Sequence, residues 1–428
     1  MSTPGYTLHA NASGAPQAGP LARLARKRLL AVLSDLPQAR ISLREGAQQS
    51  LLGSGNADDA ATLQADIEVV DAGFYLRLAA GGSIGAGEAY MDGLWRSSDL
   101  VTLLRAVARN RQRMDAMDSG GARLLGLLLR AWQATRRNTV AGSRRNIAAH
   151  YDLGNDLFEL FLSDDLMYSS AIFEHADDTL EAASQRKLER ISDKLGLGPG
   201  QHVLEIGCGW GGFAIHAARM HGCRVTGVTI SREQFACARK RVRAAGLDDR
   251  VEIVLRDYRD IQGRYDRIVS IEMVEAIGPQ YLDLYFRRIG ELLAPDGAAL
   301  IQAITIEDGR YAAALRNVDF IGRHIFPGSF IPSVGVLAGA IGRASDLRLV
   351  NLEDIGPSYA RTLQAWRERF MRRLDDVRGQ GYDERFIRMW EYYLAYCEAG
   401  FRENALGDVQ LLLHRARTPA VPWLMARH

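Results

Sequence analysis

Short apolar segments alternate with longer amphipathic segments along the second half of the chain. Short apolar runs bounded by turn residues are typical of buried strands. We expect strands at residues 203–206, 224–229, 251–255, 265–271, 298–304 and 408–414. An apolar helix follows the first of them, at 213–218. Because strands and helices alternate, the pattern predicts an α/β domain with a doubly wound parallel sheet over residues 146–428.

The region before this domain has a different pattern. Residues 1–20 are rich in Gly, Pro and Ala and are expected to be flexible. Residues 21–36, LARLARKRLLAVLSDL, predict a basic amphipathic helix, since the apolar block is too short for a signal peptide. Alternating apolar and polar positions predict strands at 66–70 and 74–78, joined by an Asp-Ala-Gly turn. We therefore expect a small N-terminal α+β domain over residues 21–105.

A glycine loop follows the first strand of the large domain, in the segment QHVLEIGCGWGG at 201–212. Gly207, Gly209 and Gly212 form a G-x-G-x-x-G motif between strand and helix. Glycine allows a tight turn there and lets a ligand lie directly against the backbone. The loop by itself fits a nicotinamide enzyme and an S-adenosylmethionine (SAM) enzyme equally well, and also a plain strand-to-helix turn.

The ends of the next strands favour SAM. A dinucleotide site needs an acidic residue about 20 residues beyond the loop, but the second strand ends in VTIS, with Thr229 and Gln234 as the polar candidates. The third strand is followed by Asp257 and Tyr258, and a carboxylate beside an aromatic ring suits an adenine. The alternative is an Asp that caps a helix. With a carboxylate after the fourth strand, this order of motifs resembles a Rossmann-like class I SAM-dependent methyltransferase domain.

Composition sets wider limits. The chain has 428 residues, 47% hydrophobic and 24% charged, which predicts a globular protein of two domains. Its four cysteines show no C-x-x-C or zinc-ligand spacing, so we expect no metal site and a reducing, cytoplasmic location. No apolar run approaches the roughly 18 residues of a membrane-spanning helix.

Positive charge is concentrated in one region, although the whole chain has a net charge of only +2. Residues 101–150 contain ten arginines and two acidic residues, around the apolar segment LLGLLLRAW at 124–132. We interpret 106–145 as a basic helical linker. It could contact an anionic membrane or pack its leucines on a neighbouring domain. Nucleic acid is not expected as a partner, because few aromatic residues accompany these arginines.

Two further segments are additions to the elements of a minimal methyltransferase. Residues 307–346, which contain HIFPGSFIPS, follow the fifth strand, where a lid or substrate wall is expected. Two C-terminal helices then carry aromatic residues at helical spacing. Most should be core, and a subset could line an acyl channel: Trp366, Phe370, Phe386, Trp390, Tyr392, Tyr393, Tyr396 and Phe401.

Several blocks in order resemble the cyclopropane-fatty-acyl-phospholipid synthase family over nearly the whole chain. They are GAGEAYMDGLWRSSDL (85–100), HYDLGN (150–155), MYSSA (167–171), EIGCGWGG, VTIS, RDYRD and the tail from YARTLQAW to YYLAYCEAGFR. The resemblance implies transfer of a one-carbon unit from SAM to a cis double bond of a phospholipid acyl chain. It also implies a homodimer at the inner face of the membrane. The SAM-binding residues it implies are Tyr168, Ser169, Gly207, Gly209, Thr229, Gln234, Asp257 and Tyr258.

The resemblance further implies a bicarbonate ion as base, held by a Cys, a Glu, a His and a Tyr. Glu275 and Tyr359 match the family's Glu and Tyr, and Cys397 matches a cysteine that we assign to the core or pocket lining. Ser170 and Gln302 stand where the family has Cys and His. These changes remove a titratable imidazole, so bicarbonate binding stays open.

Two products follow from this open point: a cyclopropane formed with water or Glu275 as base, or a methyl or methylene branch. We expect catalytic roles for Glu275, Tyr359, Ser170 and Gln302, with Glu275 as the key carboxylate. Glu272 could instead hydrogen-bond SAM or cap the next helix. The rival classes are a small-molecule SAM methyltransferase and an inactive lipid- or SAM-binding protein.

Overall fold

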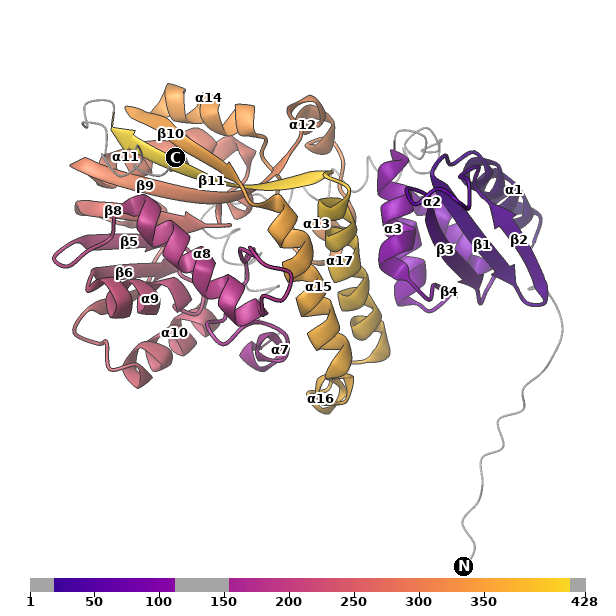
Figure 1. Cartoon of the computed structure of the whole chain (residues 1–428), viewed down its shortest axis with the longest axis horizontal. Coiled ribbons are helices and arrows are strands. Elements are labelled where there is room, and N and C mark those ends of the chain that lie inside the picture. Colours follow the sequence, from indigo (N-terminus) through magenta and orange to yellow (C-terminus); the bar gives the residue numbers. More distant parts are fainter. Residues whose placement is uncertain (1–18, 112–153, 416–428) are drawn as a thin grey trace, which may run out of the picture. The chain divides into compact units, whose positions relative to one another are not determined.

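A computed structural model describes residues 19–111 and 154–415. These residues fall into two compact units, 19–111 together with Glu384–Tyr392, and 154–383 together with 393–415 (Figure 1). The expected flexible N-terminus, nearly all of the basic linker and the start of the HYDLGN block lie outside the described residues. Among the described helices, none has the length and apolar character required to cross a membrane.

The first unit is a four-stranded sheet with helices, in the strand order β2-β1-β3-β4. Strands β1 and β3 are parallel, and β2 and β4 pair antiparallel at the two edges. Its elements are α1 (Pro20–Ser34), β1 (Ala39–Glu45), β2 (Gln48–Leu52), β3 (Leu63–Val69), α2 (Gly73–Met91), β4 (Trp95–Arg96) and α3 (Leu100–Arg109). The basic amphipathic helix predicted from the sequence is α1, which buries Ala22, Leu29 and Leu33.

The predicted strand at 74–78 is wrong, because these residues begin helix α2. Asp71 accepts a hydrogen bond from the Gly73 amide at 2.7 Å, which satisfies a backbone donor at the start of the helix. Phe74 and Tyr75 are adjacent and both buried. Adjacent residues of a strand point to opposite faces, whereas a helix can turn both toward one core. The short apolar run did not distinguish the two.

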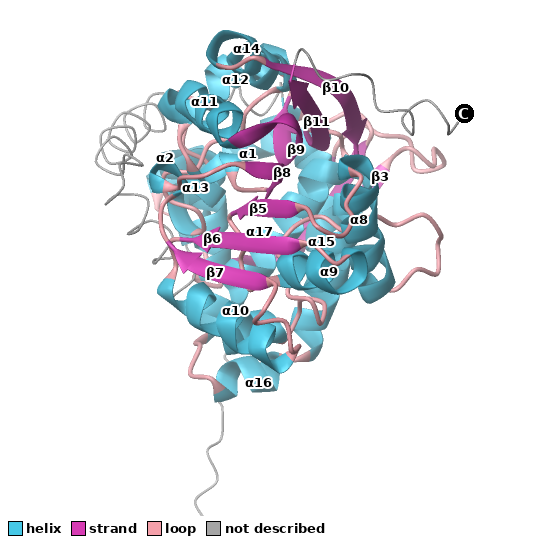
Figure 2. Cartoon of the chain, turned by 90° about the vertical axis from the view of Figure 1, so that its left-hand side faces the viewer, coloured by secondary structure: helices cyan, strands magenta, loops and turns pink. Residues whose placement is uncertain are grey.

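The second unit is built on a seven-stranded sheet in the order β10-β11-β9-β8-β5-β6-β7 (Figure 2). Neighbours among β5 to β9 are parallel, whereas β11 runs antiparallel to both β9 and β10. The strands are β5 (His202–Ile206), β6 (Arg224–Thr229), β7 (Val251–Leu255), β8 (Tyr265–Ile271), β9 (Leu293–Ile306), β10 (Leu347–Asp354) and β11 (Leu406–Arg415). The six strands expected here are present, and the predicted parallel arrangement holds for β5 to β9, while β11 and β10 add antiparallel pairs at one side. β10 was missed because this half-exposed edge strand lacks a long apolar run.

Helices cover both faces of this sheet, as Figure 2 shows. One core packs α8 (Leu180–Leu195), α9 (Gly212–His221) and α10 (Arg232–Ala244) against the strands. The other core packs α11 (Leu282–Leu292) and α14 (Val334–Ala344) against the opposite face. The result is the three-layer α/β arrangement predicted from the alternating pattern. Shorter helices of this unit are α7 (Asn155–Glu159), α12 (Asp308–Ala314), α13 (Phe320–His324) and α16 (Leu374–Gly379).

The order of strands positions the site. Chain order reverses between β5 and β8, and in open α/β sheets a ligand binds beyond the carboxyl ends of strands at such a point. The segments that follow β5, β6, β7 and β8 therefore meet at one edge. The long helices α15 (Gly356–Arg372) and α17 (Glu384–Arg402) are the aromatic helices expected before the last strand.

Candidate functional site

The glycine loop lies between β5 and α9, as the sequence predicts. Gly207 and Gly209 have φ values of +85° and +51°, a region that side chains disfavour. A Cβ atom on Gly207 would lie 2.8 Å from Cγ of Met273, and one on Gly212 would lie 2.5 Å from the carbonyl oxygen of Asp165. The amides of Gly207 and Cys208 both donate to the Val228 carbonyl, which ties the loop to β6. Glycine is thus required by both conformation and space.

The end of β6 carries a polar pair. Thr229 donates from Oγ1 to Oε1 of Gln234 at 2.9 Å, and both side chains are buried. Ser231 caps α10 by accepting from the Gln234 amide. The two residues predicted to bind a cofactor therefore lie together at this strand end.

The end of β7 is held by an ion pair. Asp257 is buried and accepts from Nε and Nη2 of Arg259 at 2.8 and 2.7 Å. It also accepts from the Arg259 amide, as the cap of a short 3-10 helix. The Tyr258 ring packs edge-on against Tyr285. The capping role weighed for Asp257 is confirmed, and its contact with an adenine remains a prediction.

The segment 168–170 approaches the same edge. The Tyr168 hydroxyl lies 2.7 Å from the Tyr393 hydroxyl, and its ring packs 5.3 Å from that of Trp366. Ser169 accepts a 2.7 Å hydrogen bond from Nζ of Lys187, a fully buried lysine of α8. Burial lowers the pKa of Lys187. The side chain of Ser170 donates to the carbonyl of Ala171.

Three of the four predicted catalytic residues converge on a fifth residue, Glu272. Its Oε1 accepts from the amide of Ser170 and from Nε2 of Gln302, both at 2.8 Å. Its Oε2 accepts from the Tyr359 hydroxyl at 2.6 Å. The suggestion that Glu272 caps the next helix is therefore wrong, since its carboxylate turns to these three donors and not to the helix amides.

A second layer of polar groups supports this carboxylate from the sheet. Nε2 of Gln302 also donates to Asp408 at 3.0 Å, and Gln410 donates to Oε1 of Gln302 at 3.2 Å. Asp408 is fully buried, and its Oδ1 has no hydrogen-bond partner among the described residues. Burial, and next the negative charges of Glu272 and Glu275, raise the pKa of Asp408 well above its usual range. This shift favours the protonated form of Asp408.

Glu275 has different surroundings. Its Oε1 accepts from the Ile304 amide at 2.6 Å, and its Oε2 has no partner within the described part of the chain. Burial, followed by the charge of Glu272, raises the pKa of Glu275 to about 8. At neutral pH this carboxyl is mostly protonated. Its backbone carbonyl accepts from the Phe330 amide, which brings the 307–346 segment against the site.

Sequence reasoning missed the central place of Glu272 and the presence of Asp408 and Lys187. No local motif could reveal them, because Glu272 finds its partners 102, 30 and 87 residues away along the chain. Cys397 is assigned no chemistry, since burial raises the pKa of its thiol.

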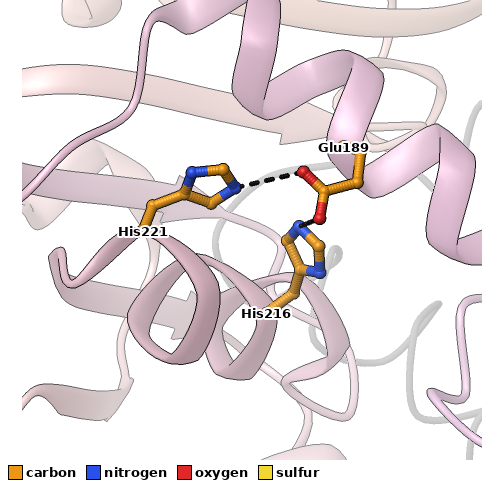
Figure 3. A group of neighbouring side chains, drawn as sticks. All are labelled: Glu189, His216 and His221. Atoms are coloured by element: carbon orange, nitrogen blue, oxygen red, sulfur yellow. Dashed lines mark ion pairs between the residues drawn. The ribbon is translucent and has the colours of Figure 1, made fainter.

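A second polar cluster lies between α8 and α9 (Figure 3). Glu189 contacts Nε2 of His216 at 3.5 Å and Nε2 of His221 at 3.3 Å. These potential ligand atoms all lie within 4.8 Å of one another. Burial lowers the pKa of His216, and Glu189 acts against this shift. The Nε2 atoms of both histidines are buried and make no hydrogen bond within the described part of the chain.

Comparisons with known proteins place these observations in a family. The model of the mycolic acid cyclopropane synthetase family matches residues 139–411. The tuberculostearic acid methyltransferase of Mycobacterium tuberculosis is 42% identical, over 80% of this chain and 81% of that protein. The cyclopropane-fatty-acyl-phospholipid synthase of Escherichia coli is 40% identical, over 81% of this chain and 86% of its own. The structure of a mycolic acid cyclopropane synthase, CmaA1, with SAH and CTAB is similar with a TM-score of 0.60, 29% identity and coverage of 64% of this chain and 98% of that one.

Proposed function

The chain belongs to the mycolic acid cyclopropane synthetase family, and we propose that it adds the one-carbon unit of SAM to the cis double bond of unsaturated phospholipid acyl chains, forming a cyclopropane. The family resemblance, the class I methyltransferase fold and SAM as methyl donor, all predicted from the sequence, are confirmed. SAM-dependent methyl transfer to lipid acyl chains is the activity of this family.

The residues present fit SAM. The glycine loop leaves its inner face free of side chains, because a Cβ at Gly207 or Gly212 would collide with neighbouring atoms. Beside the loop, the buried carboxyl of Glu205 has one oxygen without a partner among the described residues, which suits a cationic ligand group. We propose that Tyr168, Ser169, Gly207 and Gly209 bind SAM together with the strand-end residues Thr229, Gln234, Asp257 and Tyr258. When bound, SAM supplies an electrophilic methyl group.

The chain's own residues would then stabilise the cation that methyl transfer forms and remove a proton from it. An isolated alkene is a weak nucleophile, so alignment in a dry pocket supplies much of the rate. The aromatic cluster of Tyr168, Trp366, Phe326 and Tyr393 excludes water and offers π faces to positive charge. Methyl transfer leaves a carbocation that must lose a proton. The polar residues Glu275, Tyr359, Ser170 and Gln302 lie at the same strand edge, and we propose that they act in this step.

A methyl or methylene branch is the second candidate product. Two observations favour it: Ser170 and Gln302 replace the family's Cys and His, and a relative with 42% identity is named as a methyltransferase and not as a ring-forming synthase. Loss of a proton from the transferred methyl carbon closes a ring, and loss from a neighbouring chain carbon gives a methyl-branched alkene. A methylene branch forms when a hydride first shifts onto the cationic carbon and the methyl carbon then loses the proton. The groups that surround the cation therefore decide the product.

Location and assembly belong to the same proposal. We propose that the protein acts as a homodimer from the cytoplasm at the inner face of the membrane, where the acyl chains of its substrate lie. The arginine-rich stretch 101–150, with its apolar segment, supports contact with anionic lipid. Flotation with anionic and with neutral vesicles tests this contact, and equal recovery with both would contradict it.

Mass spectrometry tests the activity itself. Purified protein, SAM and vesicles of an unsaturated phosphatidylethanolamine and phosphatidylglycerol should yield acyl chains heavier by one CH2 group. Proton NMR of the product then distinguishes a cyclopropane from a branch. Unchanged vesicles together with methylation of an unsaturated free acid or thioester would show that phospholipid is not the substrate. Transfer to an amine or phenol alone would overturn the proposal.

A further inference from the structure

A three-donor pocket surrounds the Glu272 carboxylate. The donors come from three separate parts of the unit: the Ser170 amide, the Gln302 side chain on β9 and the Tyr359 hydroxyl on α15. Ser170, Gln302 and Tyr359 are also the positions at which the family resemblance implies ligands for a bicarbonate ion. All three point to protein oxygens that are already in place. A free bicarbonate ion would have to displace Glu272 to use these donors, so the residues present do not fit that ion.

We infer that the Glu272 carboxylate replaces the bicarbonate ion and is itself the base that takes the proton from the methylated acyl chain. A carboxylate and a bicarbonate ion both present two planar, negatively charged acceptor oxygens. The carboxylate differs in being tethered, so its position costs no binding of a free ion. This inference rests on the proposed function, and it moves the role of base from Glu275 to Glu272.

The backbone conformation at Glu272 supports a functional role for this residue. Its φ is +47°, in the left-handed region that residues with a side chain disfavour. Its amide donates to the Gln302 carbonyl at 2.9 Å, which holds this turn immediately after β8. Glycine would occupy the same conformation without strain. The glutamate is therefore retained against local preference at the edge where the ligand binds.

The charges around Glu272 favour its ionised form over that of its neighbours. Asp408 and Glu275, the other carboxyl groups that face it, both have pKa values raised by burial, which favours their protonated forms. Tyr359, Gln302 and Ser170 donate to Glu272, and the buried Lys187 adds positive charge. Burial still raises the pKa of Glu272, which makes the carboxylate a stronger base than an exposed one.

Methyl transfer followed by proton loss accounts for every bond, electron pair and proton involved. The π electron pair of the alkene forms a bond to the methyl carbon while the sulfur–carbon bond breaks and leaves its pair on sulfur. The resulting cation loses a proton to Glu272, and the C–H electron pair becomes the new ring bond or a double bond. Glu272 becomes a carboxylic acid and returns its proton to water before the next turnover. No oxidant, reductant or further anion is required.

Carbonate depletion and three variants test the inference with the full chain, SAM and unsaturated phospholipid vesicles. Wild type should keep its rate in carbon dioxide-free buffer. Glu272→Gln, which cannot accept the proton, should lose about 10²-fold or more in kcat. Its SAM affinity, measured by calorimetry, should stay within about threefold of wild type. Glu272→Gly suits the positive φ, so it should fold, lose activity and regain at least about tenfold with added bicarbonate or formate. Glu275→Gln, the matched control, should keep more activity than Glu272→Gln.

Two results would overturn the inference. One is a wild-type enzyme that loses its activity without bicarbonate and regains it when the ion is added. The other is Glu272→Gln with the kcat of wild type. Failure of the proposed function looks different, because wild type itself would then transfer no methyl group to any unsaturated lipid, and the inference would fall with it.

Discussion

Two glutamates of the second unit, Glu272 and Glu189, each lie in a cluster of polar residues, but the two clusters differ in their donors and in their place in the fold. Glu272 accepts three hydrogen bonds from neutral donors that come from three elements. Glu189 contacts two histidines of a single neighbouring helix, as Figure 3 shows. The residue types around Glu189, one carboxylate and two histidines, are typical of a metal site. Those around Glu272 are not typical of any particular catalytic site. Residue types alone would therefore select the wrong cluster.

Position in the fold separates them. Glu272 follows β8 directly, at the carboxyl edge where chain order reverses. Helix α9 begins at the glycine loop on this edge, so His221, its last residue, lies at the opposite end of the helix. There a histidine also interacts favourably with the helix dipole. The strand ends next to a polar cluster therefore indicate its chemical role better than its residue types do.

The largest effect on kcat is expected when the same substitution is made at each of the two glutamates in turn. Glu272→Gln should lower kcat about 10²-fold or more, since it removes the proposed proton acceptor. Glu189→Gln makes the same chemical change in the other cluster and should leave kcat within about twofold. Steady-state assays on phospholipid vesicles measure both. Equal losses in the two variants would erase the distinction.

A smaller effect is expected from Tyr359→Phe, which removes one donor to Glu272. Hydrogen bonds to charged groups are worth roughly 1.5–3 kcal/mol, so kcat should fall at least about tenfold. The Tyr359 hydrogen bond lowers the pKa of Glu272. Without it, the acidic limb of the pH–rate profile should move to higher pH. An unshifted limb would show that Tyr359 does not act on the base.

Glu275→Gln should change how stability depends on pH. The folded-state pKa of Glu275 is about 8, against an ordinary value of 4.5. In this window the folded protein keeps a proton that the unfolded chain releases, so wild type loses stability as pH rises from 4.5 to about 8. The slope for one group is at most about 1.4 kcal/mol per pH unit. Urea unfolding should show the variant gaining on wild type toward pH 8, and a constant difference would contradict this.

The smallest effect, with the opposite sign, is expected from His216→Gln. Burial lowers the pKa of His216, and the groups that face it are Glu189, His221, Asp165 and Lys187. The unfolded chain binds a proton here more readily, so wild type loses stability as pH falls below 6.5. The variant should resist acid slightly better, with unchanged kcat. Urea unfolding at pH 5 and pH 7 measures this, and a variant that loses as much stability as wild type on acidification would contradict it.

Local patterns explain why much of the fold could be predicted. Each strand from β5 to β9 contains a short apolar run, and the positive φ values in the glycine loop suit few residues other than glycine. Residues 74–78 show the limit, because a short apolar run fits a strand or a helix until its partners are known. The half-exposed strand β10 gave no such signal.

The α/β class, the glycine loop and the family could be predicted from the residues alone, because these features depend on residue order over short stretches. Which carboxyl group is surrounded by donors became visible only in the folded chain. Glu272 and Glu275 are three residues apart, yet one meets Ser170, Gln302 and Tyr359 while the other meets a single backbone amide. The physical reason is that a buried carboxyl group takes its charge state from groups that folding brings to it from distant parts of the chain.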